Sequence, residues 1–423
     1  MGRDVDLTIR YSLLFKKIRM KNSFLFLQDV YRSQKFTELF SFMVWELFHR
    51  LRLFPKEKYL QFNNHEALIL ENLDFNEKVN HCFNVNGLSI IKSEHNWKRI
   101  FINNKQEVFG SLYSDNCGLY KSTDYGKSIV FMDRFPQQVK SIFITSQNTI
   151  FVCTKGVVYR SLDGGSSFQK SLDLGSYDSI FRHNNEMTET PDRTLIIGEY
   201  GNIWDNNGWR RLAYLYFSSD EGKTWERSDF LIKKGVNKHV HLVKYSKLLN
   251  KVFMADGDNY KKLWISDALN LSDLSDPKKW KAVNKFHIQM GGYTSIVESD
   301  EKILFGTDYQ GGTNFLVETE DGKKFTKKVV PDPYRRSPII NMVQRKSKSG
   351  NEIWAVLPFS TANSKCLLMC SMDGGKSWFK VIEYNKAIHH VGLISSSNET
   401  ADVLYFSIEN LINKDRFVYK ISD

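Results

Sequence analysis

Three stretches of the chain repeat one eight-residue pattern, and this pattern decides the fold. They are Ser161-Leu-Asp163-Gly-Gly165-Ser-Ser167-Phe168, Ser218-Ser-Asp220-Glu-Gly222-Lys-Thr224-Trp225 and Ser371-Met-Asp373-Gly-Gly375-Lys-Ser377-Trp378. A short run with Tyr, Phe or Leu, typical of a β-strand, precedes each copy. The Asp carboxylate can accept hydrogen bonds from its own turn, and the Gly permits a left-handed residue. The pattern therefore predicts a repeated turn between two β-strands.

Further copies of the pattern are degenerate. Ser122-Thr-Asp124-Tyr-Gly126-Lys-Ser128 has Ile129 where the aromatic residue should be. Glu318-Thr-Glu320-Asp-Gly322-Lys-Lys-Phe325 has Glu in place of both the Ser and the Asp. Near Ser266 an insertion interrupts the pattern, and Trp280 supplies the missing aromatic residue. The copies are 39 to 57 residues apart, which suits a unit of four short strands with loops.

This Ser/Thr-x-Asp-x-Gly-x-Thr/Ser-aromatic pattern resembles the Asp-box (BNR) repeat of the sialidase-like β-propeller superfamily. The resemblance implies that each box joins the third and fourth strands of a blade. It also implies that four box residues are structural, namely Asp124, Asp163, Asp220 and Asp373. The predicted fold is an all-β propeller of six or seven four-stranded blades. Seven is favoured because three strand-like runs follow the last box, and a strand from residues 66–72 would complete their blade. Six is the alternative because the sialidases that this chain resembles have six blades.

The chain divides into two parts, a helical extension over residues 1–61 and the propeller over residues 62–423. From Phe36 to Phe54 apolar residues recur at helical spacing, and Leu13-Leu-Phe15 opens a second apolar stretch followed by basic residues. A basic amphipathic helix can pack on its own domain or on a partner chain, or lie on an anionic membrane. Both uses remain open.

Composition excludes several classes of protein. Hydrophobic residues make up 41% and charged residues 25% of the 423 residues, the balance of a globular protein and not of a disordered one. The net charge is +11, but residues 1–60 hold 12 Lys/Arg and 6 Asp/Glu, which leaves 47 and 42 for the rest. The propeller is thus nearly neutral, and nucleic acid is not an expected partner. Five scattered cysteines, no signal peptide and no apolar span predict a cytoplasmic location, with peripheral membrane contact as an alternative.

Candidate functional residues lie where inner strands begin or second strands end, because these points line one mouth of a propeller's channel. The catalytic candidates are His183, Glu199, Tyr200, His239, His241, Asp256 and Asp308. The candidates for substrate binding are Arg182, Asp258, Tyr309 and Arg335.

These residue types suit two reactions. Paired carboxylates, or a Tyr with a Glu, suit glycoside hydrolysis. A His or Tyr base beside a cation suits β-elimination from a uronic-acid polysaccharide, because proton abstraction next to a carboxylate needs its charge neutralised. His239 and His241 share one strand face and could also hold a metal with Asp256 or Asp258. No metal or other cofactor is predicted.

The resemblance to sialidases implies an Arg-Ile-Pro motif before the first box. Here the nearest run is Arg134-Phe-Pro136, which follows the first box. The sequence therefore predicts a carbohydrate-active propeller, a hydrolase or lyase acting on an acidic glycan or polysaccharide, with Arg182 or Arg335 binding its carboxylate. The alternative is a non-catalytic propeller that binds a glycan or a protein partner, as a receptor or assembly factor.

Overall fold

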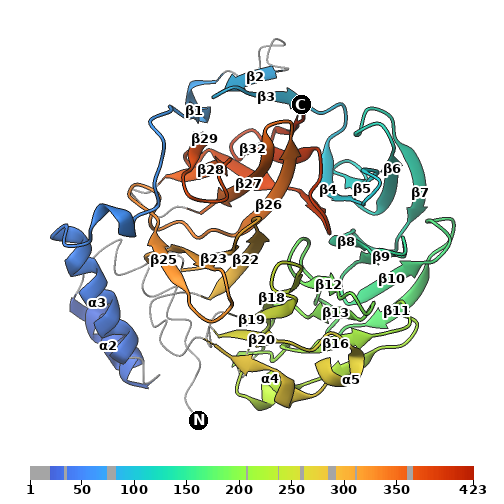
Figure 1. Ribbon diagram of the computed structural model, residues 1–423, viewed down its shortest axis with the longest axis horizontal. Coiled ribbons are helices and arrows are strands. Elements are labelled where there is room, and N and C mark those ends of the chain that lie inside the picture. The colour runs from blue at the N-terminus through green and yellow to red at the C-terminus, as the bar shows by residue number, and fades with distance from the viewer. Residues whose placement is uncertain are drawn as a thin grey trace.

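Seven sheets of four or five strands form a ring of blades around a central axis (Figure 1). The computed structural model describes residues 20–32, 36–73, 82–205, 208–236, 238–257, 262–283, 292–309, 312–359 and 365–423. Two helices, α2 (Met20–Arg32) and α3 (Phe36–Arg50), lie outside the ring. The prediction of an all-β propeller, with seven blades in preference to six, is confirmed.

Six blades each use one stretch of chain, in which successive strands run antiparallel from the inside of the ring to the outside. Blade by blade, these strands are β4 (Trp97–Ile102), β5 (Val108–Leu112), β6 (Gly118–Ser122) and β7 (Val130–Arg134); β8 (Ser141–Ile144), β9 (Ile150–Cys153), β10 (Val157–Ser161) and β11 (Gln169–Asp173); β12 (Met187–Glu189), β13 (Leu195–Gly198), β16 (Leu215–Ser218) and β17 (Glu226–Ser228); β18 (Val240–Ser246), β19 (Lys251–Asp256), β20 (Leu263–Ser266) and β21 (Lys281–Ala282); β22 (Tyr293–Glu298), β23 (Ile303–Thr307), β24 (Phe315–Thr319) and β25 (Thr326–Val329); and β26 (Asn341–Ser347), β27 (Gly350–Leu357), β28 (Cys366–Ser371) and β29 (Phe379–Tyr384).

The middle strands of the blades are continuous apolar runs because each blade packs between two others. Every residue of β9, β23 and β28 is buried. Sheets covered on both faces favour such runs over strict alternation of apolar and polar residues. This explains why apolar residues dominate these strands.

The seventh blade combines the two ends of the ring. Its inner strands are β30 (His389–Leu393), β32 (Leu404–Asn410) and β33 (Arg416–Ile421). The outer strands come from the beginning of the propeller, since β3 (Leu88–Lys92) pairs with β33 and β2 (Cys82–Val85) pairs with β3. The prediction that residues 66–72 complete this blade is wrong.

Residues 66–72 instead join the outside of the preceding blade. There β1 (Leu68–Ile69) pairs in parallel with β29, and the short helix η2 (Leu70–Asn72) follows. Strand β31 (Ser395–Ser397) adds a second closure by pairing in parallel with β4 of the first blade. Strands from the beginning and from the end of the propeller therefore pair with each other where the ring closes.

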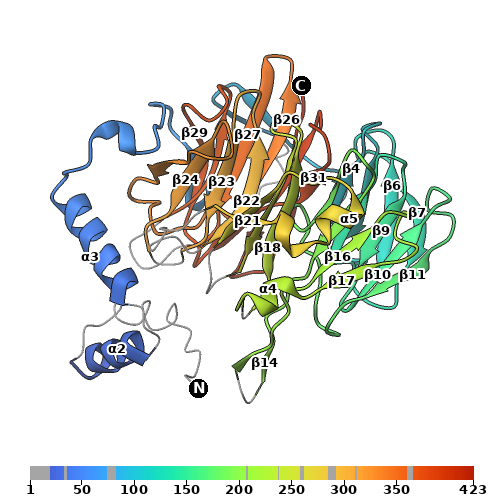
Figure 2. The same ribbon diagram turned by 60° about the horizontal axis from the view of Figure 1, so that its bottom comes forward.

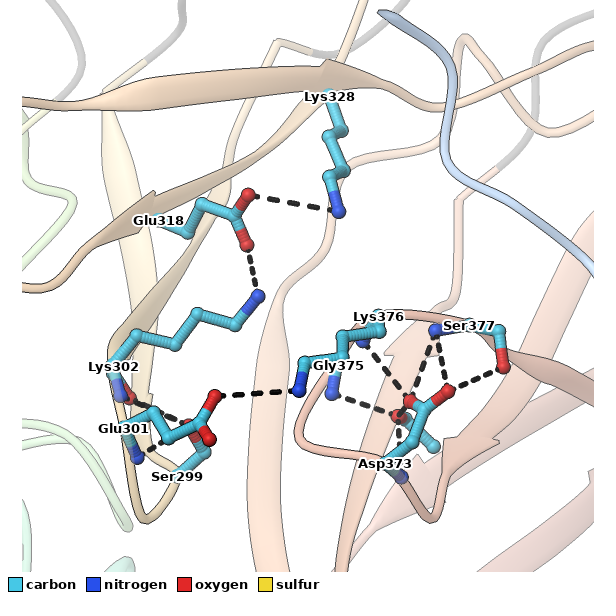
Figure 3. Close-up of polar contacts among 10 residues, drawn as sticks. Ser299, Glu301, Lys302, Glu318, Lys328, Asp373, Gly375, Lys376 and Ser377 are labelled. Atoms are coloured by element: carbon cyan, nitrogen blue, oxygen red, sulfur yellow. Dashed lines mark hydrogen bonds and ion pairs between the residues drawn. The ribbon is translucent and has the colours of Figure 1, made fainter. Parts of the chain in front are cut away.

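The repeated turns are built by local hydrogen bonds, as Figure 3 shows for the turn between β28 and β29. The Ser371 hydroxyl donates to Asp373 Oδ1 (2.8 Å) and accepts from the amide of Gly375 (2.8 Å). The Asp373 carboxylate accepts from the amide (2.9 Å) and the hydroxyl (2.6 Å) of Ser377. The same four contacts occur around Asp124, Asp163 and Asp220.

The turn between β24 and β25 is aligned differently from the prediction. Thr319 and Asp321 take the places of the Ser and the Asp, and the amide of Gly322 donates to Thr319 Oγ1 (2.9 Å). Glu318 instead forms ion pairs with Lys302 and with Lys328 (3.6 Å), as Figure 3 also shows. The turn is one residue shorter than the others, which is why the pattern matched the sequence in the wrong register.

Three short helices and a hairpin decorate two neighbouring blades. After β17 comes α4 (Phe230–Lys233), and the insertion before β21 forms α5 (Leu271–Leu274) and η3 (Pro277–Lys279). Trp280 is buried there and its ring stacks on Phe230, with 6.2 Å between centroids. The hairpin of β14 (Trp204–Asp205) and β15 (Gly208–Trp209) lies between β13 and β16.

Helix α3 lies outside the ring, near β25 in Figure 1 and on the side of β24 in Figure 2. Glu46 forms an ion pair with Arg335, and His49 Nε2 contacts Asp332 (2.6 Å). After α3, the helix η1 (Lys56–Lys58) leads into an extended segment that bridges to β25 at Tyr59. Residues 13–15, predicted as the second apolar stretch, lie outside the described residues.

Candidate functional site

Four of the predicted side chains meet at one mouth of the ring, where inner strands begin. The Tyr200 ring lies 4.1 Å from the His239 ring and 6.4 Å from the His241 ring, centroid to centroid. The guanidinium carbon of Arg182 lies 4.8 Å from the Tyr200 centroid, within range of a cation–π interaction. Tyr200 is half-buried, and its hydroxyl accepts a hydrogen bond from Asn202 Nδ2 (2.9 Å). These four residues come from two neighbouring blades. Arg182 and Tyr200 belong to the blade of β12 and β13, and His239 and His241 belong to the blade of β18.

Arg182 is held by contacts to three blades. Its Nε pairs with Glu186 Oε1 (2.5 Å), and Nη2 donates to the carbonyl oxygens of His241 and, at 3.5 Å, Thr294. The side chain is nevertheless 20% exposed. Nη1 has no hydrogen-bond partner in the part of the chain that the structure describes. Part of the Arg182 side chain thus remains exposed, while the charges of Glu186 and Asp308 act on its guanidinium.

The two histidines are buried on the same face of the β18 segment. His239 Nδ1 donates a hydrogen bond to the carbonyl oxygen of Gly201 (2.8 Å), so this nitrogen carries a proton. A Cβ on Gly257 would lie 2.5 Å from His239 Cδ2, so only glycine fits beside this ring. Both imidazole rings are therefore held in position beside the Tyr200 ring.

Two acidic residues lie near this group. Asp256, at the end of β19, is buried and accepts hydrogen bonds from Trp264 Nε1 (2.9 Å) and the amide of Lys262 (2.9 Å). Burial raises the pKa of Asp256 to about 6, although the hydrogen bonds from Trp264 and Lys262 favour its charged form. Asp308, after β23, is half-buried and attracts the charge of Arg182.

Glu199 and His183 point away from this mouth. The Glu199 carboxylate is buried between blades and accepts from Tyr216 Oη (2.6 Å) and the amide of Gly175 (3.0 Å). His183 contacts the carbonyl oxygen of Ile100 through Nε2 (2.7 Å). Both side chains join neighbouring blades.

The remaining candidates for substrate binding are dispersed. Tyr309 is 9% exposed, and its backbone is held by hydrogen bonds to the Asn314 side chain. Arg335 is buried against Glu46 and donates to Thr313 Oγ1 (2.8 Å). Asp258 lies outside the described residues.

Sequence reasoning missed the partners that orient the site. Glu186 is fully buried and binds Arg182, four residues before it. Asn185 Nδ2 donates to the carbonyl oxygen of Thr294 (2.9 Å). This hydrogen bond connects the same loop to β22, the inner strand two blades further along the chain. The Arg-x-x-x-Glu spacing within one short loop was a signal that could have indicated the ion pair.

A hollow of about 900 Å³ lies near the ends of the inner strands, and five of its lining residues also line a small hollow beside Arg182, namely Asn184, Lys244, Ser396, Ser397 and Asn398. Turns between first and second strands line it, with Arg193, Lys247, Asp300 and Lys346 among the charged residues. None of the predicted site residues lines the larger hollow. Among the described residues, no group of three His, Cys, Asp or Glu side chains is placed to hold a metal ion.

Comparison with known proteins adds support for the fold. No protein-family model matches the chain, and no curated protein matches it in sequence. Among solved structures, virginiamycin B lyase from Staphylococcus aureus with quinupristin superposes with a TM-score of 0.53 and 12% identity, over 81% of this chain and 98% of that one.

Two further structures are similarly related. A streptogramin B lyase has a TM-score of 0.51 and 12% identity, over 81% of this chain and 97% of that one. A chain of the mitotic checkpoint complex has a TM-score of 0.51 and 11% identity, over 79% and 91%. At this identity, the likeness shows that the chain shares their propeller fold.

Proposed function

We propose that the chain is a carbohydrate-active propeller of the Asp-box type that cleaves an acidic polysaccharide by β-elimination. The observation that carries this proposal is the half-buried Tyr200 ring, whose centroid lies 4.8 Å from the partly exposed guanidinium of Arg182. A proton-transfer group next to a cation is the arrangement that elimination beside a carboxylate needs.

Each group has a definite part in the proposed reaction. Arg182 binds the uronate carboxylate and stabilises the negative charge that develops when C5 loses its proton. Tyr200, in its phenolate form, takes that proton, the bond from C4 to the leaving oxygen breaks, and a C4–C5 double bond forms. The Tyr200 hydroxyl then returns the proton to the leaving oxygen, so the reaction needs neither water nor an oxidant. His239 and His241 position the Tyr200 ring.

Hydrolysis finds less support in this site. Two carboxyl groups must reach opposite sides of the glycosidic bond. Glu199 and Asp256 are both 0% exposed, and hydrogen bonds hold both carboxylates inside the blades. Their burial favours elimination over hydrolysis.

The proposal is tested by incubating the full chain with uronate polysaccharides and following the ultraviolet absorbance of the unsaturated product. Tyr200→Phe removes the hydroxyl and keeps the ring, so we expect kcat to fall by about 100-fold or more. Tyr177→Phe is the matched control, because the Tyr177 side chain is 75% exposed and has no part in the proposed reaction, so the rate should not change.

Two results would contradict this function. The first is wild-type activity in Tyr200→Phe. The second is binding of the polysaccharides without any unsaturated product, which would identify the chain as a non-catalytic binding propeller.

A further inference from the structure

The helical extension exposes an apolar surface that the propeller does not cover. Nine large side chains on or just after α2 and α3 are between 49% and 70% exposed. They are Phe24, Leu27, Tyr31, Phe36, Phe40, Met43, Leu47, Leu51 and Leu53. We call this set the helical apolar surface. Exposed apolar surface of this extent commonly marks a binding site for a protein or a membrane.

The helical apolar surface is distinct from the side of α3 that holds the ring. Phe36, Phe40, Met43 and Leu47 follow each other at intervals of three or four residues, so they lie along one side of the helix. The other side carries Trp45, whose ring centroid lies 5.2 Å from that of Phe315. Attachment to the propeller through Trp45 therefore leaves these four side chains exposed.

Helix α2 is arranged in the same way. Phe26 and Val30 are buried and pack against Leu39 of α3. Phe24 and Tyr31 are 69% and 70% exposed. The two helices thus contact each other through one side and present apolar side chains on another.

The charge around the helical apolar surface indicates what covers it. Between residues 50 and 58 the exposed charged side chains are four bases, Arg50, Arg52, Lys56 and Lys58, and one acid, Glu57. Arg52 is exposed between Leu51 and Leu53, and Arg50 is 74% exposed at the end of α3. A second copy would bring a like charge to the same surface, whereas an anionic surface would be attracted to it.

We propose that α2 and α3 dock the protein on a membrane surface that contains anionic lipids. Apolar side chains with flanking Lys and Arg residues are typical of helices that lie in the plane of the lipid headgroups. No helix in the described part of the chain is long and apolar enough to cross a membrane. This docking is independent of the chemistry at Tyr200.

Co-sedimentation of the full chain with lipid vesicles tests this docking. We expect binding to vesicles that contain phosphatidylglycerol, less binding to pure phosphatidylcholine, and weaker binding at high salt. The variant Phe40→Ser/Met43→Ser/Leu47→Ser should bind at least about tenfold more weakly. Because these side chains are exposed, its unfolding midpoint in urea should equal that of the wild type.

A matched control and a charge variant separate the two contributions. Leu162→Ser/Tyr177→Ser/Ile412→Ser changes three side chains that are 57%, 75% and 72% exposed on the propeller, and should bind vesicles as the wild type does. Arg50→Gln/Arg52→Gln/Lys56→Gln should lose the preference for phosphatidylglycerol.

Equal binding by the helix variant and the propeller control would overturn the proposal. A dimer in light scattering that the helix variant abolishes, without any vesicle binding by the wild type, would overturn it too. That result would assign the surface to a second copy of the chain.

Discussion

At the scale of single residues, His183 shows how burial sets a protonation state. Its Nδ1 accepts a hydrogen bond from the amide of Ile142 (3.3 Å), so that nitrogen carries no proton, and Nε2 donates to the carbonyl oxygen of Ile100. Burial, with the charge of Arg99, lowers the pKa of His183 to about 3. A proton on Nδ1 would point at the N–H group of Ile142, and the two hydrogens would repel each other. The neutral ring is therefore part of the contact between three successive blades.

This pKa predicts a loss of stability in acid. Because the pKa of His183 falls from 6.5 to about 3 on folding, only the unfolded chain binds the proton between these values. Stability is then complete above pH 6.5 and is lost as pH falls through this window. We expect His183→Gln to lose less of its unfolding free energy than the wild type between pH 6.5 and pH 4. Urea unfolding at a series of pH values measures this.

Exposed His65 provides the control for this prediction. His65→Gln should keep the wild-type dependence on pH. Parallel curves for the wild type and His183→Gln would show that the protonation of His183 does not govern acid stability.

The sequence located the mouth but not the direction of each side chain in it. Glu199 and Tyr200 are neighbours at one strand end, and both were predicted to be catalytic. Successive side chains of an extended segment point to opposite sides. The Glu199 side chain therefore points into the blade, while the Tyr200 side chain faces Arg182. A single sequence does not show which of the two alternating sets of side chains faces the mouth.

At the scale of elements, the repeated turn is a self-contained unit. Ser371, Asp373 and Ser377 satisfy each other and the turn backbone within seven residues. Although partial burial works against it, the hydrogen bonds from Ser377 and Ser371 hold the pKa of Asp373 below its usual value. Contacts between neighbours in sequence leave a pattern in sequence, which is why these turns and the strands beside them were predictable.

Removal of one such carboxylate should destabilise the blade. We expect Asp373→Ala to lower the unfolding free energy by about 1–2 kcal/mol, as loss of a capping side chain does. Asp402→Ala is the control, because the Asp402 side chain makes no hydrogen bond with the described residues, and it should change stability by less than about 0.5 kcal/mol. Equal effects in denaturant unfolding would show that the hydrogen bonds of the turn contribute nothing specific.

At the scale of the whole molecule, the ring is held by contacts between residues far apart in sequence. Strand β3 pairs with β33, and Arg335 binds Glu46, which is 289 residues away. Such contacts depend on the three-dimensional course of the chain and leave no local pattern. For this reason the sequence predicted the wrong closing strand, residues 66–72. For the same reason it predicted that Arg335 binds substrate and not Glu46.

The closure by β3 can be tested with two neighbouring residues on opposite faces of the strand. Ile90 is 0% exposed and packs in the apolar core, whereas Ile91 is 36% exposed. We expect Ile90→Ala to cost about 2–4 kcal/mol of unfolding free energy, because it leaves a cavity. Ile91→Ala should cost less than about 1 kcal/mol. A similar loss in both variants would contradict the position of β3 between β33 and β2.

The proposed elimination is tested most directly by the mass of the product that the protein releases from a uronate polysaccharide. Elimination with Tyr200 predicts oligosaccharides with an unsaturated uronate at the non-reducing end, lighter by one water than hydrolysis products, and their absence with Tyr200→Phe. Products that contain the added water, or unsaturated products at the wild-type rate from Tyr200→Phe, would contradict it.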